Sequence, residues 1–98
     1  MNQSYKCKSP ILFLVFNRPD VTSRVFQAIR DVRPSKLYVA SDGSRGHKDG
    51  EAEVVARVRK IATQVDWDCE VLTLFRERNL GCGKAVSKAI TWFFENEE

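Results

Sequence analysis

Short apolar runs alternate along the chain with longer segments whose apolar residues recur at helical spacing. The runs predict strands over 10–16, 36–41 and 69–75. The intervening segments predict helices that begin near Asp20 and Glu51 and, for the third, cover about 84–96. The first run, 11–16, is apolar without alternation, which is typical of a strand covered on both faces in a parallel sheet.

Each predicted helix has one apolar stripe that should face the sheet. The first begins beside Pro19, with Asp20 placed to cap it, and Pro34 follows its end. The basic residues Arg57, Arg59 and Lys60 of the second helix are expected on a solvated face. The stripes comprise Val21, Val25, Ala28, Ile29 and Val32; then Val54, Val55, Val58, Ile61, Ala62 and Val65; then Ala85, Val86, Ala89, Ile90 and Phe93.

This βαβαβα order predicts an α/β fold, a three-layer Rossmann-like parallel sheet with helices packed against it. The strand over 10–16 is the most apolar, as is typical of a central strand, so it is expected to be central. With three strands in all, one of its edges is nevertheless expected to have no strand to pair with. A sheet of three strands is small for this architecture. We therefore expect 10–98 to be part of a larger domain, preceded by a flexible N-terminal arm over 1–9.

The amino-acid composition indicates the class of protein but not its function. The hydrophobic share of 43% and charged share of 30% are those of a globular domain, and a net charge of +3 is too mild for a nucleic-acid partner. No apolar run approaches the length of a membrane span. The three cysteines are widely spaced, which favours reduced thiols and a cytoplasmic location, and one histidine, His47, is too few for a zinc cluster.

Polar clusters follow the predicted strands, where open α/β sheets bind their ligands. The cluster 42–44 offers a carboxylate to a base imide or ribose hydroxyl, although Asp42 could equally cap its own turn. The cluster 79–84 opens the third helix, whose free N–H groups attract phosphate, and Lys84, Arg76 and Arg78 add positive charge there. Arg78 and Ala85 occupy positions where a Walker A loop needs Gly and Ser or Thr, so an ordinary helix entry is the alternative.

Two other features are less promising. Asp66-Trp67-Asp68 has the form of a metal-binding Asp-x-Asp, but it precedes the third strand and therefore lies at the opposite end of the sheet. His47 sits in a polar loop without a nucleophile beside it and is expected to be a surface residue.

Taken in order, Phe16-Asn17-Arg18-Pro19, Ser41-Asp42-Gly43-Ser44 and Arg78-Asn79-Leu80-Gly81 resemble the first half of the GT-A glycosyltransferases, the nucleotide-diphosphosugar transferases. The Asn-Arg-Pro start is similar to the N-acetylglucosaminyltransferase branch and its bacterial relatives. The resemblance covers about 10–96 and implies a truncated GT-A domain that binds a nucleotide-sugar donor, with UDP as the expected nucleotide.

The resemblance also implies roles for individual residues. Phe16, Asn17 and Arg18 would line the base and ribose pocket, and Asp42 would hydrogen-bond the base. Near the ribose and diphosphate would lie Asn79, Gly83 and Lys84.

The family's metal-binding Asp-x-Asp follows the next strand, and its catalytic base comes later. A divalent metal, Mn²⁺ or Mg²⁺, is thus expected in the longer parent, while no catalytic residue or metal ligand is assigned in this chain. Since a departing diphosphate needs a metal or an equivalent cation cluster, the chain alone is expected to transfer no sugar.

The main alternative is a non-catalytic α/β interaction module that forms a homodimer through the edge of the first strand. A receiver-like phosphoacceptor domain fits poorly, because Asn17-Arg18 stands where such domains place adjacent acids.

Overall fold

The computed structural model describes residues 9–97 and contains the six predicted elements in the predicted order. They are β1 (Ile11–Val15), α1 (Pro19–Val32), β2 (Lys36–Ser41), α2 (Glu51–Ala62), β3 (Glu70–Phe75) and α3 (Cys82–Asn96). All but the last residue of the predicted arm over 1–9 lie outside the described residues. The alternation of strand and helix read from the sequence is confirmed.

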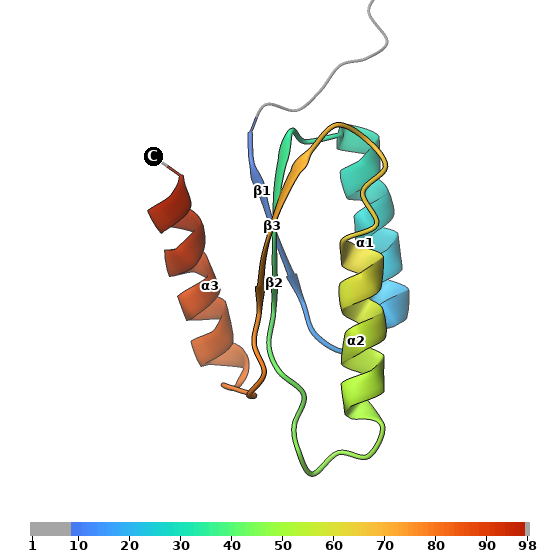
Figure 1. Ribbon diagram of the computed structural model, residues 1–98, viewed down its shortest axis with the longest axis vertical. Helices are drawn as coiled ribbons and strands as arrows, with labels where there is room; N and C mark the ends of the chain where they lie inside the picture. Colours follow the sequence, from blue (N-terminus) through green and yellow to red (C-terminus); the bar gives the residue numbers. More distant parts are fainter. Residues whose placement is uncertain (1–8, 98) are drawn as a thin grey trace, which may run out of the picture.

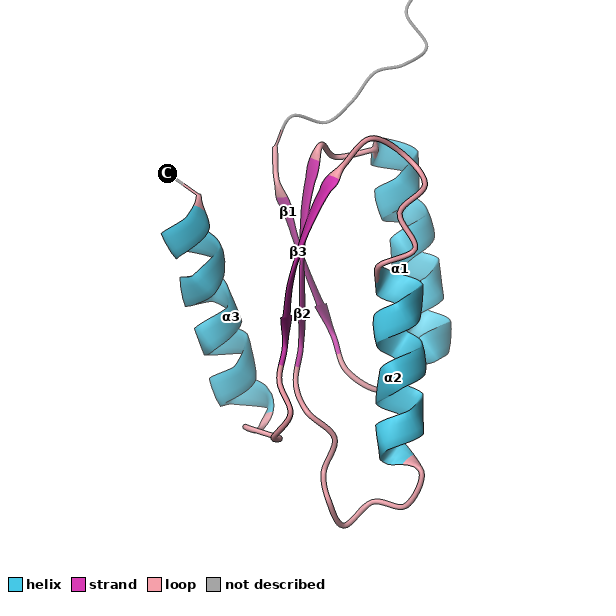
Figure 2. Ribbon diagram, viewed as in Figure 1, coloured by secondary structure: helices cyan, strands magenta, loops and turns pink. Residues whose placement is uncertain are grey.

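The three strands form one parallel sheet in the order β1-β2-β3 (Figures 1 and 2). Figure 1 shows α1 and α2 on one face of the sheet and α3 on the other, so the molecule has three layers. All strands point the same way, and their carboxyl ends meet the loop before α2 and the loop before α3. The predicted α/β class with a Rossmann-like arrangement is confirmed at this level.

The predicted place of β1 at the centre of the sheet is wrong for the part of the chain described. β2 is the central strand, and its Leu37, Tyr38 and Val39 are fully buried. β1 is at an edge, where Leu14 keeps 43% of its surface exposed. An unbroken apolar run predicts cover on both faces, but β2 alone gains a hydrogen-bonded neighbour on each side as well.

The predicted inward stripe of α1 is correct at Ile29 and wrong at its other positions, which are exposed. Thr22, Phe26 and Ile29 are buried, whereas Val21 and Val25 are 38% and 42% exposed. The large Phe26 ring gains most from burial, and it packs 5.8 Å from the Trp67 ring, centroid to centroid.

The start of α1 differs from prediction too. The helix begins at Pro19, so Asp20 lies inside its first turn, and no side chain caps it. Proline is well suited to this first helical position because its missing N–H would have no partner there.

The C-terminal turns of α3 are held on the sheet by aromatic and polar contacts. Tyr38 lies between the rings of Trp92 and Phe93 in edge-to-face contacts at 5.1 and 4.8 Å. The Tyr38 hydroxyl donates to the Glu97 carboxylate, which also pairs with Lys36 Nζ at 2.8 Å. The hydrogen bond from Lys36 is the main reason that the pKa of Glu97 is lowered.

Within residues 9–97, no helix combines the length and the apolar character that crossing a bilayer requires.

Candidate functional site

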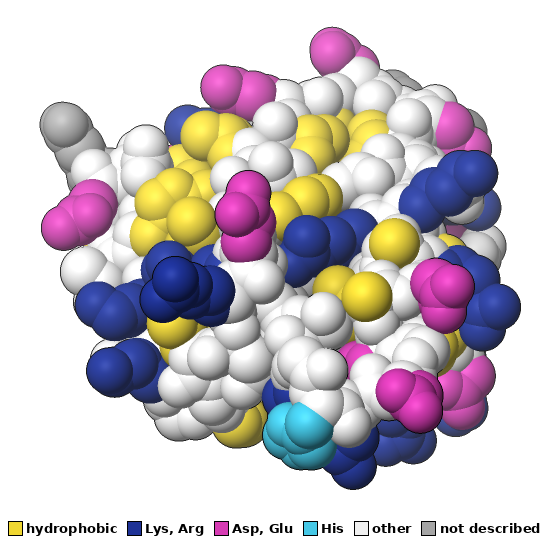
Figure 3. All heavy atoms as spheres, turned by 60° about the horizontal axis from the view of Figure 1, so that its bottom comes forward, with side chains coloured by type: hydrophobic (Ala, Val, Ile, Leu, Met, Phe, Trp, Pro, Cys, Tyr) yellow, Lys and Arg dark blue, Asp and Glu magenta, His cyan; other side chains and the backbone are white. Residues whose placement is uncertain are grey.

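A cleft of about 470 Å³ opens at the carboxyl end of the sheet, between the sheet and α3. Its inner wall is apolar and its rim is polar, the usual composition of a ligand pocket. The end view in Figure 3 shows apolar side chains gathered beside Lys and Arg side chains. The apolar wall comprises Leu14, Ala40, Leu74, Ala85, Val86 and Ala89.

Asp42 joins the two loops that border this cleft. Its side chain follows β2 directly and is only 9% exposed. One carboxylate oxygen accepts the N–H groups of Gly43 and Leu80, at 2.8 and 2.9 Å, and the other accepts that of Gly81, at 3.1 Å. The Asp42 carboxylate, which was predicted to hydrogen-bond a base, therefore also holds the loop before α3 against the end of β2.

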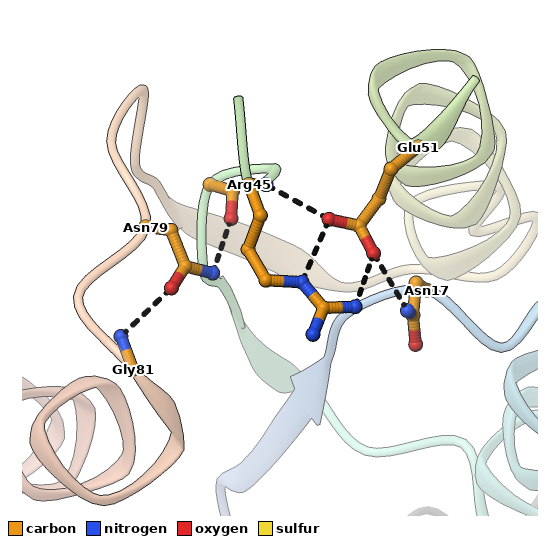
Figure 4. Close-up of polar contacts among 6 residues, drawn as sticks. Asn17, Arg45, Glu51, Asn79 and Gly81 are labelled. Carbon is orange, nitrogen blue, oxygen red and sulfur yellow. Dashed lines mark hydrogen bonds and ion pairs between the residues drawn. The ribbon is translucent and has the colours of Figure 1, made fainter. Parts of the chain in front are cut away.

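Asn79 makes a second connection between the same loops (Figure 4). Its side-chain NH₂ donates to the Gly43 carbonyl at 2.8 Å, and its side-chain oxygen accepts the Gly81 N–H at 3.1 Å. The loops come so close that a Cβ on Gly43 would lie 2.6 Å from the carbonyl carbon of Arg78. Only glycine fits at position 43, because the obstacle is backbone rather than a flexible side chain.

Glu51, at the first position of α2, holds the loop after β2 against the end of β1 (Figure 4). Its carboxylate is 7% exposed and accepts from the Arg45 backbone N–H at 2.8 Å and from the Arg45 guanidinium at 3.0 and 2.6 Å. Asn17 donates a further bond at 3.0 Å. Hydrogen bonds from Arg45 lower the pKa of Glu51 to about 2, so the carboxylate stays charged at neutral pH.

Arg59 of α2 contacts the loops after β2 and β3 from the face of the sheet opposite α3 (Figure 1). Its guanidinium donates to Ser41 Oγ at 2.9 Å, to the Asp42 carbonyl at 3.1 Å and to the Arg76 carbonyl at 2.7 Å. It also lies 4.8 Å above the centroid of the Phe75 ring. Burial lowers the pKa of this guanidinium. The prediction that Arg59 belongs to a solvated face is wrong. Arg59 follows the buried Val58, and its side chain is half-buried against the carboxyl ends of β2 and β3.

The seven residues predicted to bind nucleotide fall into two groups. Phe16, Asp42 and Asn79 line the cleft. The other four do not: Asn17 binds Glu51 in the neighbouring pocket, Arg18 is exposed 4.0 Å from Asp20, and Gly83 and Lys84 are exposed on the first turn of α3.

The sequence analysis missed two residues of this region, Arg45 and Glu51. Both belong to a polar glycine-containing loop and the helix start that follows it, where spacing gives no sign of which side chains will pair.

The Asp66-Trp67-Asp68 segment lies where it was expected, before β3 and away from the cleft. Asp66 pairs with Arg30 at 3.4 Å, and the Trp67 indole donates to the Pro34 carbonyl at 2.8 Å. Across residues 9–97, no cluster of three or more His, Cys, Asp or Glu side chains could hold a metal ion. His47 is exposed in the loop between β2 and α2.

Comparison of the chain with protein-family models, curated proteins and solved structures gave no match.

Proposed function

We propose that this chain forms the nucleotide-binding part of a glycosyltransferase whose donor is a nucleotide sugar, with UDP as the nucleotide. One observation carries the proposal: residues from the three sequence motifs, Phe16, Asp42 and Asn79, line one cleft at the carboxyl ends of parallel strands. The helices change from one face of the sheet to the other between α2 and α3, beside this cleft. Ligands of open α/β sheets bind at such places.

The chemistry of the cleft suits a nucleoside. Its apolar wall can take a flat base, and the Phe16 ring offers a stacking surface. Three N–H groups occupy most of the acceptor capacity of Asp42, which leaves room for one further donor such as a base imide or a ribose hydroxyl.

The divalent metal implied by the resemblance does not fit the described cleft. Asp42 is the one carboxylate among the described residues that line it, and backbone N–H groups surround that carboxylate. A metal for sugar transfer would need carboxylates other than the one that lines this cleft. We therefore propose nucleotide binding, without transfer, for this chain, and a cytoplasmic location in keeping with its widely spaced cysteines.

Calorimetric titration of UDP into the chain, with ADP as a competitor nucleotide, tests the proposal. We expect UDP to bind more tightly than ADP. Ala85→Phe fills the cleft from α3 without touching a polar contact and should abolish binding, whereas Ser87→Phe on an exposed position of the same helix should not. A folded chain that binds no nucleotide, or an Ala85→Phe variant that binds normally, would refute the proposal.

The second candidate function is an interaction module that dimerises through β1. It is favoured by the outer edge of β1, which no strand within residues 9–97 covers. Sedimentation velocity distinguishes the two. A wild-type dimer that binds no nucleotide, and that Leu12→Lys on β1 but outside the cleft lining converts to a monomer, would favour this module.

A further inference from the structure

Two arginines, Arg45 and Arg76, border the cleft, and neither is among the nucleotide contacts implied by the family resemblance. They come from different loops, one after β2 and one after β3. Two guanidinium groups on one rim favour an anionic ligand, and Asp42, the one carboxylate among the described residues that line the cleft, is already surrounded by N–H donors.

The backbone fixes the direction of Arg76. Its N–H donates to the Ser41 carbonyl at 3.0 Å, which extends the ladder between β2 and β3 by one residue, and its carbonyl accepts from Arg59. Side chains alternate along an extended strand, so Arg76 lies on the same face as Leu74, which lines the cleft. Within residues 9–97, the Arg76 guanidinium has no hydrogen-bond or ion-pair partner.

Glu51 fixes the direction of Arg45. The carboxylate binds Nε and one terminal nitrogen, and Figure 4 shows the other terminal nitrogen turned away from Glu51 with no contact drawn to it. The guanidinium also lies 5.6 Å from the centroid of the Phe16 ring. A side chain held at one end by a buried carboxylate loses little further freedom on binding a ligand with its remaining donors.

We propose that Arg45 and Arg76 bind the phosphate groups of the nucleotide, an inference that rests on the proposed nucleotide function. A guanidinium matches the oxygens of a phosphate with paired N–H donors. Lys84 and Arg78, which lie at the start of α3, are exposed and do not line the cleft, so solvent and salt screen them. The two arginines recognise phosphate without a metal, and affinity increases with each added phosphate.

Titrations of uridine, UDP and inorganic pyrophosphate in EDTA test this inference. We expect wild-type protein to bind UDP at least about tenfold more tightly than uridine, since one charge-assisted hydrogen bond is worth that factor. Arg76→Gln should remove most of this difference while leaving uridine affinity unchanged. Arg45→Lys keeps a cation beside Glu51 but loses the paired donors, and should weaken UDP binding several-fold.

The matched controls are Lys84→Gln, which removes a cation outside the cleft, and Arg57→Gln on the exposed face of α2. Both should bind UDP like wild type. Equal affinity of wild type and Arg76→Gln for UDP would overturn the inference, as would an equal loss in Lys84→Gln.

The same titrations separate this inference from the proposed function. Pyrophosphate binding that Arg76→Gln weakens, with no added affinity from the uridine part, would keep the phosphate site and refute the nucleotide assignment. UDP binding that Arg76→Gln leaves intact would do the reverse.

Discussion

Replacing Gly43 by alanine should destabilise the fold through one backbone collision. The added Cβ would lie 2.6 and 2.7 Å from the carbonyl carbon and oxygen of Arg78 and 2.7 Å from the carbonyl carbon of Glu77. Ordinary carbon contacts are at about 3.5 to 4.0 Å, so one loop must move by roughly 1 Å. That loop is held by Asn79 and by Asp42, and both contacts would lengthen.

The magnitude follows from these two costs. Overpacking of this kind costs about 1 to 3 kcal/mol, and a weakened hydrogen bond adds about 1 kcal/mol. We expect Gly43→Ala to lose about 2 to 4 kcal/mol of unfolding free energy, which lowers Tm by about 10 °C or more in a domain of this size.

Gly46→Ala is the matched control, since a Cβ there has no heavy atom within 4 Å and the Gly46 backbone lies outside the left-handed region. It should change stability by less than about 1 kcal/mol, in the stabilising direction, because alanine reduces the freedom of the unfolded chain. Urea unfolding followed by circular dichroism and tryptophan fluorescence measures both variants. Equal stability of Gly43→Ala and Gly46→Ala would show that the loops are not in contact as described.

Three further substitutions test other parts of the structure. The pKa of Glu51 is lowered to about 2 from an ordinary value of 4.5, so the stabilisation from its charge is complete above about pH 5 and is lost as pH falls toward 2. The unfolding free energy measured across this range should depend less on pH in Glu51→Gln than in wild type. An unchanged pH profile would contradict the contact with Arg45. Arg59→Met removes three hydrogen bonds, to Ser41 Oγ and to the Asp42 and Arg76 carbonyls, of which the Asp42 carbonyl keeps the Ser41 hydroxyl as a donor. It should cost about 2 to 3 kcal/mol in urea unfolding, whereas Arg57→Met on the exposed face should cost little. Phe26→Ala should cost about 3 to 5 kcal/mol and Val25→Ala much less, and the opposite order would restore the stripe first predicted for α1.

The sequence was sufficient for the elements because each apolar run has its own boundary. The strand over 36–41 was predicted with the bounds it has in the structure, since Pro34 precedes it and polar residues follow it. The spacing of apolar residues in α1 could not predict which side of that helix faces the sheet. Two rows of residues with helical spacing lie side by side on that helix, and the contact of Phe26 with the distant Trp67 decides which row faces inward.

The candidate site, too, was predictable in part from the sequence and in part only from the structure. That Phe16, Asp42 and Asn79 would meet follows from parallel topology alone, because all three come after carboxyl ends of strands in one sheet. The cations were predicted only in part. Lys84, Arg76 and Arg78 were expected to add charge at the start of the third helix, but of these Arg76 alone lines the described cleft. Arg45 was not predicted, because its direction depends on its contact with Glu51.

Asp42 serves the fold whether or not it binds a nucleotide. Its carboxylate accepts three N–H groups and thereby sets the position of the loop that contains Asn79 and leads into α3. Any Asp42 variant would move that loop, so a loss of binding would follow even if Asp42 never touched the ligand. Ala85→Phe avoids this coupling, because it changes the volume of the cleft from the opposite wall and leaves the carboxylate and its donors in place. Binding that is lost in Ala85→Phe while stability is kept therefore assigns the nucleotide to this cleft.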